Sequence, residues 1–459
     1  MSNKLFYLLI LIINFPVMLC CKGQNSKNEE YVDVRNYGAV GDGKTDDTQA
    51  FQKAADLKKP LLVKNTGKEY LISARIRLYN SIKGEGNPVI KMTDCVNEFV
   101  IPDKYTYGKY SLFHIGNYQS DTPLVIEGLT LDGGWNNMSK GSEFEAGIYI
   151  AGSKNITIRK NIIKNNLGDN ILVYWYNSGF EKSVSLVNEN ILIEDNILSH
   201  PYRCNIALIS GRNVKIMNNT IYKFNDHVAP VDLEMDLWEE DGQVIRDVEI
   251  TGNTIKSTKT LYSISMLGML DGVNGIKVSN NIIQCGFEKD SFGINLEAAY
   301  GPIKNVEIKN NKIDAVGFVR ISGTKGNKKI TIESNQVYTK GTESVVVNGS
   351  YIDGLKVLKN KSLVSKNFYS NIILGREVKN VSIFSNDFES LKWSSLFFVS
   401  DIDGLDIDDN ILKSKNTPIY FEPERDYSIR NVRISNNTIN TNFLEIYKST
   451  KKIKNISTK

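Results

Sequence analysis

The 459-residue sequence carries 56 Lys and Arg against 52 Asp and Glu, a formal net charge of +4 at pH 7. This excess is too dilute to predict a nucleic-acid-binding surface, and no apolar run beyond the N-terminus is long enough to span a bilayer. Cys95, Cys204 and Cys285 stand far apart without the spacing of a metal site, which favours buried free thiols.

The chain begins with a predicted export signal, residues 1–21. A charged start precedes the apolar run Leu5–Ile13 and a short segment that ends at Cys20 and Cys21, and a run of this length is typical of secretion rather than of a membrane span. The segment resembles a bacterial lipoprotein signal, in which Cys21 or Cys20 would carry the lipid; simple cleavage is the alternative. A polar linker, residues 22–30, follows. We expect export to the periplasm, the outer membrane or the exterior of a bacterium, with membrane attachment only through a lipid anchor.

Residues 31–51 predict a strand, a glycine-rich turn and a helix. Asp46 and Gln49 have the three-residue spacing of a capping box. The helix would then present a mostly apolar face made of Phe51, Ala54, Ala55 and Leu57. Because a solenoid leaves its terminal coil unburied, an amphipathic helix in this place is expected to cap one.

The turn and the helix start contain Gly38, Gly41, Asp42, Gly43, Thr45, Asp46, Asp47 and Ala50. This set resembles the N-terminal signature of the pectate-lyase-like superfamily, whose members include rhamnogalacturonases, polygalacturonases, epimerase-like proteins and viral tailspikes. The resemblance implies an all-β fold, a right-handed parallel β-helix (solenoid) with an N-terminal capping helix. We expect one such domain over residues 31–455 and a tail over residues 456–459.

An Asn-centred unit recurs along most of the chain, each copy following an alternating apolar stretch. The spacing of about 23 to 35 residues is the period of a solenoid, and the alternation predicts roughly a dozen coils of short parallel strands. We expect the asparagines to form an internal ladder and to adopt the left-handed conformation of a tight corner. They are Asn161, Asn196, Asn219, Asn253, Asn281, Asn311, Asn335, Asn360, Asn386, Asn410 and Asn437.

Coils about 4.8 Å apart place equivalent residues of successive strands in columns. Alignment of five central strands predicts an inward column of Val173, Leu208, Leu233, Met266 and Leu296. One outward column contains Leu172, Ala207, Asp232, Ser265 and Asn295, and a second contains Tyr174, Ile209, Glu234, Leu267 and Glu297. Three acids are therefore expected in one outer groove.

Paired carboxylates in such a groove suit the cleavage of a glycosidic bond. The Cα atoms of Asp232 and Glu234 would lie roughly 7 Å apart, and those of Glu234 and Glu297 roughly 10 Å apart. Either pair fits better with an inverting glycosidase, whose acid and base stand about 6.5 to 9.5 Å apart, than with a retaining one. Close carboxylates raise one another's proton affinity, so one serves as acid and the other as base. The first prediction is an inverting glycoside hydrolase that acts on a polysaccharide or oligosaccharide without a cofactor.

Turns that flank these strands supply further candidates. Asp169, His200 and Arg203 are candidate catalytic residues, because a histidine can transfer a proton and an arginine can hold a sugar carboxylate. Aromatic and polar side chains nearby could bind sugar rings, with core packing as the alternative for the aromatic ones. The candidate substrate-binding residues are Tyr174, Trp175, Tyr202, Asp226, His227, Trp238 and Asn295.

Two other functions stay open. Polygalacturonases of the superfamily carry four motifs, of which Gly168-Asp169-Asn170 matches one in part. Superfamily lyases often hold Ca²⁺ with acids on this face, and Asp232, Glu234 and Asn205 resemble such a cage, with Arg203 as the base. The second prediction is therefore a calcium-dependent lyase acting on a uronic-acid glycan. The third is a non-catalytic glycan-binding or surface protein, since the fold permits many functions.

Overall fold

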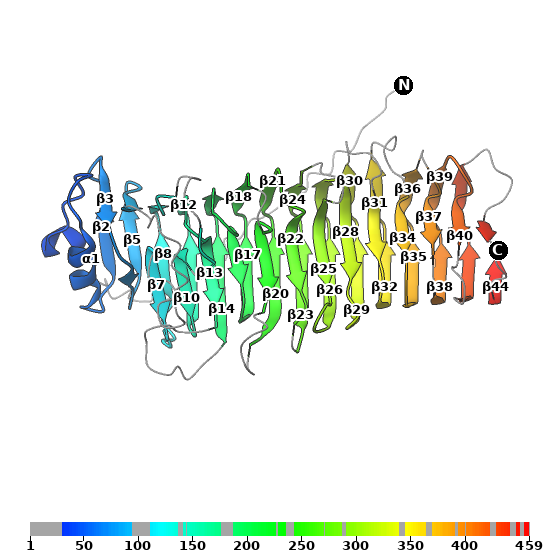
Figure 1. The fold of residues 1–459 in the computed structure, drawn as a ribbon, viewed down its shortest axis with the longest axis horizontal. Helices are drawn as coiled ribbons and strands as arrows, with labels where there is room; N and C mark the ends of the chain where they lie inside the picture. Colours follow the sequence, from blue (N-terminus) through cyan, green and yellow to red (C-terminus); the bar gives the residue numbers. More distant parts are fainter. Residues whose placement is uncertain are drawn as a thin grey trace, which may run out of the picture. The chain divides into compact units, whose positions relative to one another are not determined.

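In the computed structural model, short parallel strands stack along one axis (Figure 1). The structure describes residues 30–93, 111–135, 141–143, 145–175, 187–225, 228–235, 243–269, 271–286, 291–338, 345–363, 370–390, 393–399, 401–422, 428–440, 447–449 and 454–458. From Tyr31 onward these residues belong to one compact unit. No helix within these ranges is both long and apolar enough to cross a bilayer.

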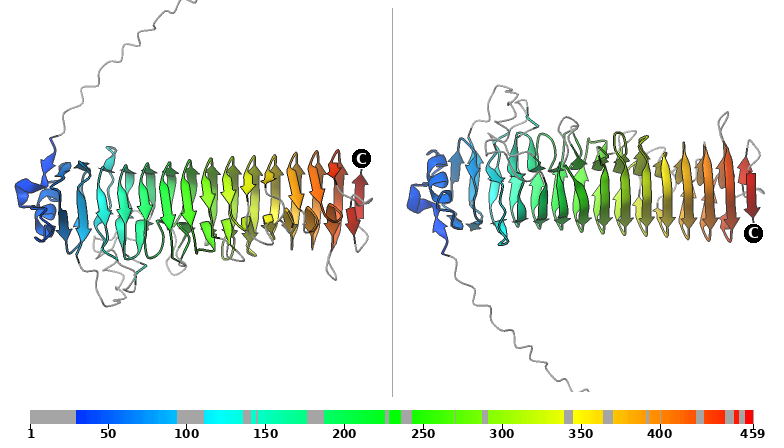
Figure 2. Two further views of the ribbon diagram at one scale, coloured as in Figure 1. Left: turned by 90° about the horizontal axis from the view of Figure 1, so that it is seen from above. Right: turned by 90° about the horizontal axis from the view of Figure 1, so that it is seen from below.

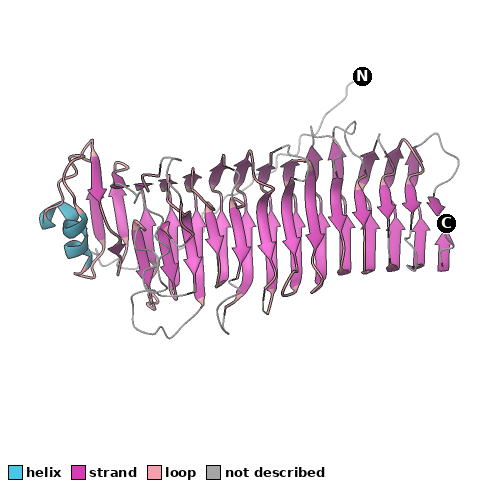
Figure 3. Ribbon diagram, in the orientation of Figure 1, coloured by secondary structure: helices cyan, strands magenta, loops and turns pink. Residues whose placement is uncertain are grey.

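One end of the stack is closed by a short helical cap (Figure 3). It contains β1 (Val32–Asp33), the 3-10 helix η1 (Val34–Tyr37) and α1 (Thr48–Ala55). The predicted capping box is wrong, because Asp47 is the N-cap residue and Asp46 accepts from the backbone N–H of Thr48 at 3.0 Å. Phe51 is buried in the core as predicted, but Leu57 lies beyond the helix and is 44% exposed. The apolar face is therefore shorter than predicted.

Three parallel sheets, named A, B and C, form the sides of the stack, and successive strands pass from one sheet to the next. Sheet A contains 16 strands: β1, β2 (Leu61–Lys64), β5 (Ile82–Glu85), β8 (Leu124–Glu127), β11 (Lys154–Arg159), β14 (Asn188–Glu194), β17 (Gly211–Met217), β20 (Ile245–Thr251), β23 (Val273–Ser279), β26 (Ile303–Lys309), β29 (Asn327–Glu333), β32 (Ile352–Leu358), β35 (Val378–Phe384), β38 (Ile402–Asp408), β41 (Ile429–Ser435) and β44 (Lys454–Thr458).

Sheets B and C each contain 14 strands. Sheet B contains β3 (Glu69–Ile72), β6 (Val89–Met92), β9 (Thr130–Asp132), β12 (Ile162–Lys164), β15 (Ile197–Ser199), β18 (Thr220–Lys223), β21 (Thr254–Ser257), β24 (Ile282–Gln284), β27 (Lys312–Asp314), β30 (Gln336–Tyr338), β33 (Lys361–Leu363), β36 (Asp387–Ser390), β39 (Ile411–Ser414) and β42 (Thr438–Asn440). Sheet C contains β4 (Ile76–Arg77), β7 (Phe113–Gly116), β10 (Ala146–Ala151), β13 (Asp169–Tyr174), β16 (Ile206–Leu208), β19 (Val231–Glu234), β22 (Tyr262–Leu267), β25 (Phe292–Glu297), β28 (Gly317–Ser322), β31 (Val345–Gly349), β34 (Ile372–Leu374), β37 (Leu396–Phe398), β40 (Ile419–Phe421) and β43 (Tyr447–Ser449).

This arrangement confirms the predicted right-handed parallel β-helix, and two opposite views show the regular repeat of its coils (Figure 2). Isoleucine, valine and leucine from all three sheets fill the space between them. β44 pairs with β41 as far as Thr458, so the domain boundary predicted at residue 455 falls inside a strand. Cys204 and Cys285 are buried free thiols as expected, whereas Cys20, Cys21 and Cys95 lie outside the described residues.

The predicted asparagine ladder runs from Asn161 to Asn437. The amide Nδ2 of each ladder Asn before Asn437 donates to the Oδ1 of the next Asn at 2.9 to 3.1 Å. A second hydrogen bond goes to a strand carbonyl, as from Asn281 to Ile250 at 2.9 Å. The predicted left-handed conformation belongs instead to the residue before each ladder Asn, such as Asn280 with φ 56°. The ladder therefore fixes the corner through its side chains.

Candidate active site on sheet C

The strand register of sheet C aligns the acids as the sequence predicts. Asp232 pairs with Ser265, which pairs with Asn295. Glu234 pairs with Leu267, which pairs with Glu297, so Glu234 and Glu297 occupy one column two coils apart. Leu233 between the first two acids is buried in the core, and alternate residues of a strand point to opposite faces. The three carboxylates therefore share the outer face of sheet C.

Asp232 is the buried member of these three acids. Its residue surface is 3% exposed, whereas Glu234 and Glu297 are half-buried. Burial raises the pKa of Asp232 well above its usual range, and the neighbouring charge and side-chain hydrogen bond of Glu234 raise it further. Arg203 acts in the opposite direction on this pKa. Asp232 and Glu234 thus form a pair that retains a proton at pH values where an exposed carboxyl would lose it.

Glu297 stands apart from this pair. The Nδ2 of Asn295 lies 3.5 Å from Glu297 Oε2, at the limit of a hydrogen bond. Asn295, which was predicted to bind substrate, is itself buried. It is therefore placed to orient Glu297 rather than to present its amide openly to a ligand.

Asp169 and Arg203 lie close to each other, and the charge of Arg203 also acts on Asp232. Asp169 is fully buried, its Oδ1 accepts from the backbone N–H of Cys204 at 2.7 Å, and its Oδ2 lies 4.0 Å from Arg203 Nη1. Burial raises the pKa of Asp169 although the charge of Arg203 opposes that rise. Burial lowers the pKa of Arg203, but the charges of Asp169 and nearby acids outweigh it and raise the pKa overall. Arg203 therefore stays charged, and the role of a general base predicted under the lyase alternative does not suit it.

Lys223 is a buried cation that the sequence prediction missed. It ends β18, is fully buried, and its Nζ donates to the backbone carbonyl of Tyr202 at 3.2 Å and to Asn225. Its charge lowers the pKa of Asp169. The alternation that buries Ile221 also buries Lys223 two residues later, so the strand pattern contained a signal for this position.

Two aromatic residues predicted to stack on sugars are buried. Tyr174 and Trp175 are 4% and 5% exposed, and their rings lie 5.9 Å apart. They pack with Tyr149 in a small apolar cluster on the outer side of sheet C. Tyr202 is half-buried and stands edge-on to Trp135 at 5.5 Å. Tyr174 and Trp175 thus offer no open face to a ligand, which corrects the prediction for these two.

His200 lies on a different side of the coil from the acids. It follows β15 of sheet B, is exposed, and its ring packs 5.1 Å from that of Phe224. The predicted proton-transfer role is therefore not supported by its position. The candidates Asp226, His227 and Trp238 lie outside the described residues.

The predicted calcium cage does not fit the donors present. Asn205 is buried, its Oδ1 accepts from Asn170 Nδ2 at 2.7 Å, and its Nδ2 donates to the carbonyl of Tyr222 at 3.0 Å. The amide is therefore engaged at the corner between sheets B and C. Across the described ranges, no three His, Cys, Asp or Glu side chains converge as a metal site.

Replacing Asp232 with asparagine is expected to stabilise the protein at neutral pH. A carboxyl whose pKa is raised on folding costs nothing below its unfolded pKa of about 4, and its cost grows as the pH rises from that value to the raised folded pKa. The thermal midpoint of Asp232→Asn should therefore exceed that of the wild type at pH 8, and the difference should shrink as the pH falls to 4. An equal or larger difference at pH 4 would show that burial of the carboxylate is not the cause.

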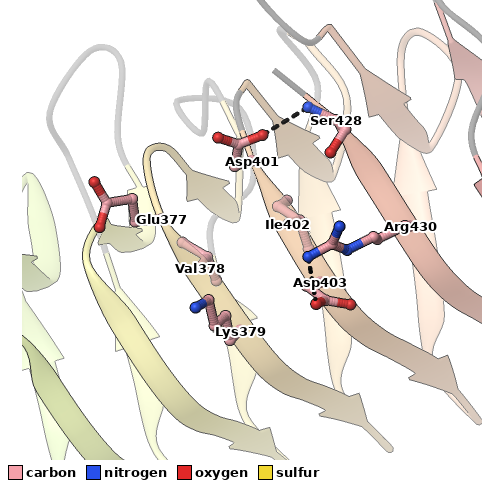
Figure 4. Close-up of a pocket in the computed structure, with 8 residues that line it drawn as sticks. All are labelled: Glu377, Val378, Lys379, Asp401, Ile402, Asp403, Ser428 and Arg430. Carbon is pink, nitrogen blue, oxygen red and sulfur yellow. Dashed lines mark hydrogen bonds and ion pairs between the residues drawn. The ribbon is translucent and has the colours of Figure 1, made fainter. Parts of the chain in front are cut away.

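A separate hollow of about 400 Å³ lies on sheet A in the C-terminal coils (Figure 4). Two of its charged lining residues form an ion pair, with Arg430 Nη2 2.9 Å from Asp403 Oδ2, and a third, Asp401, accepts from the backbone N–H of Ser428 at 2.6 Å. Glu377 and Lys379 complete its charged rim. These contacts join neighbouring coils of sheet A, so we assign the hollow a structural role and keep the acids of sheet C as the candidate active site.

Comparison with known proteins supports the fold. A family model described as a right handed beta helix region matches residues 115–337. The pre-neck appendage protein of Bacillus phage B103 is 28% identical over 302 residues, which cover 63% of this chain but only 30% of that protein. The Dettilon tailspike protein aligns with a TM-score of 0.54 and 12% identity, over 78% of this chain and 66% of that one. PfbA, a surface adhesin of Streptococcus pneumoniae, aligns with a TM-score of 0.50 and 16% identity, over 87% and 92%.

Proposed function

We propose that this member of the right-handed parallel β-helix superfamily is an exported enzyme that cleaves glycosidic bonds of a polysaccharide lying along sheet C. The observation that carries the proposal is the buried carboxyl of Asp232, which lies beside Glu234 on the outer face. Neighbouring coils place Ala207 and Ser265 at the position of Asp232. A buried carboxyl beside the half-buried Glu234 costs stability there, and perturbed acids cluster at functional sites.

The acid pair and Glu297 have complementary parts in an inverting hydrolysis. Asp232 and Glu234 share a proton and act as the general acid that protonates the leaving oxygen. Glu297 lies two coils from Glu234, about 10 Å away between Cα atoms. Side chains that lean toward one another across that distance reach the range of about 6.5 to 9.5 Å that admits a water molecule. Glu297 then acts as the base that activates this water, oriented by Asn295.

The half-buried Ser265 lies on the coil between the acid pair and Asn295. Its small side chain leaves space beside Asp232, whereas Leu267 occupies the position between Glu234 and Glu297 in their column. The charge of Arg203 limits the rise of the pKa of Asp232. A glycan is the substrate class that this use of carboxyl groups suits, and the likeness to a tailspike and a surface adhesin agrees with a protein that works outside the cell.

A glycan screen tests the proposal and separates it from its alternatives. The purified protein would be incubated with uronic-acid and neutral polysaccharides of plant, algal and host origin, and the products measured in two ways. A hydrolase forms new reducing ends without ultraviolet absorbance, whereas a lyase forms an unsaturated product that absorbs. We expect the first result with at least one glycan. Retention of a glycan without either product would establish a binding protein and overturn the enzymatic proposal.

A further inference from the structure

The outward column that contains Asp232 changes character along the solenoid. On the N-terminal side of Asp232 its members Tyr149, Leu172 and Ala207 are buried. On the C-terminal side, beyond the buried Asn295, the register continues the column through residues that are half-buried or exposed: Arg320, Asn348, Ile373, Phe397 and Tyr420. The open part of this column therefore begins at Arg320, one coil beyond Asn295, and extends in one direction.

The far end of this open column is aromatic. The rings of Phe397 and Tyr420 stack with centroids 5.7 Å apart and planes 16° apart. Trp393 stands edge-on to Tyr420, with centroids 6.1 Å apart. We call these three residues the aromatic platform. Because coils are about 4.8 Å apart, the platform lies four to five coils, roughly 19 to 24 Å, beyond Asn295.

Arg320 lies between the acids and the aromatic platform. It occupies the coil next to Asn295 in the same column, and its guanidinium donates to the hydroxyl of Tyr262 and lies 5.9 Å from that ring. The residues beside it in this face, Asn348 and Ser322, are uncharged. Glu297 lies on the neighbouring strand of the same face, where it pairs with Ser322. Arg320 is therefore a cation held by an aromatic ring beside the acids, and it is suited to an acidic group of a ligand that reaches them.

We propose that the outward column from Arg320 to Tyr420 binds the same polysaccharide that is cleaved at the acids, and that this polysaccharide carries acidic groups. Flat apolar rings are suited to stack against the apolar faces of sugar rings, so the platform holds a distal sugar while Arg320 pairs with a carboxylate or sulfate near the acids. The proposal rests on the proposed function, since it takes the acids as the place of cleavage. Because the column is buried on the N-terminal side, the bound polysaccharide can extend from the acids only toward the C-terminal coils.

Two variants test whether the outward column from Arg320 to Tyr420 binds the polysaccharide. The acidic probes are alginate and polygalacturonate, each used as the polymer and as its trimer, and dextran is the neutral polymer. Phe397→Ala combined with Tyr420→Ala should raise the KM or dissociation constant for the acidic polymer about tenfold and leave the trimer unchanged, as expected for the loss of two stacking contacts. Arg320→Gln should lower the preference for acidic polymer over dextran about tenfold. Phe384→Ala, which removes an exposed aromatic ring from sheet A, is the matched control and should change neither value.

The outcomes separate this proposal from the proposed function. If Glu234→Gln abolishes cleavage while the platform variant and Arg320→Gln bind polymer as the wild type does, the proposed binding column is wrong and the enzymatic proposal stands. If the wild type binds acidic polymer without cleaving any glycan, and the platform variant no longer binds this polymer, the proposed binding column is supported and the enzymatic proposal is overturned. If the platform variant instead changes the sedimentation of the protein from an oligomer to a monomer, the surface is a contact between copies of the chain and the proposed binding column is overturned.

Discussion

Replacement of Glu234 with glutamine is expected to lower kcat/KM on the cleaved glycan by about 10²- to 10⁴-fold, the contribution typical of general acid catalysis. The substitution keeps the size of the side chain and removes the second titratable group of the acid pair. It also removes the like charge that helps to raise the pKa of Asp232, so Asp232 would lose its proton at lower pH. Initial rates from reducing-end release, measured over a range of substrate concentrations, would give this loss.

Glu249→Gln is the matched control for that experiment. Glu249 lies on β20 of sheet A, in the coil that follows β19, and it is half-buried without facing the acids of sheet C. It should leave kcat/KM unchanged. Equal activity of Glu234→Gln and the wild type would remove the acid pair from the mechanism, even if the fold and the asparagine ladder stand.

The pH dependence of wild-type activity is a second, independent test of the acid pair. The acid pair must hold its proton to act, and burial followed by the charge of Glu234 raises the pKa of Asp232. Activity should therefore extend to higher pH than an ordinary carboxyl would allow, and should fall as the pH rises through this raised pKa.

Period and alternation were enough to predict the columns of sheet C. A one-residue slip would turn every side chain of a strand to the other face, so the apolar residues Val173, Leu208 and Leu233 fix the register, and the acids follow from it. The ladder was predictable for the same reason, because an Asn at each corner has its next partner one coil away. The alternation within a strand and the geometry of a coil both recur in every repeat, so the register found in one coil can be checked against the next.

Burial on the outer face was not predictable from the same pattern. The alternation of β13 places Tyr174 outward, but it contains no information on whether other parts of the chain cover that face, and the ring is 4% exposed. Asn205 likewise has the side-chain chemistry of a calcium ligand, yet its amide bonds to Asn170 and Tyr222. Contacts between a strand and residues outside its own repeat decide these positions, and the period does not describe such contacts.

Replacement of Asn281 with alanine is expected to lower the free energy of unfolding by about 3 kcal/mol or more. Asn281 is 1% exposed, its Nδ2 donates to Asn311 Oδ1 at 3.0 Å and to Ile250 O at 2.9 Å, and its Oδ1 accepts from the backbone N–H and the amide of Asn253. Alanine removes all four bonds and leaves buried donors and acceptors unsatisfied, each at about 1 to 3 kcal/mol. Urea unfolding followed by circular dichroism would measure the change.

Asn274→Ala provides the control on the same coil. Asn274 belongs to β23 and accepts a single exposed hydrogen bond from Asn305 at 2.7 Å, so its loss should cost no more than about 0.5 kcal/mol.

Asn281 lies between β22, which carries Ser265, and β25, which carries Glu297. Because each coil of a solenoid contacts only its neighbours, a break at this rung loosens the spacing of the two carboxyl groups as well as the stack. We therefore expect Asn281→Ala to lower kcat at temperatures where the variant is still folded, and Asn274→Ala to leave kcat unchanged. An unaltered kcat in a folded Asn281→Ala protein would show that the ladder supports stability alone.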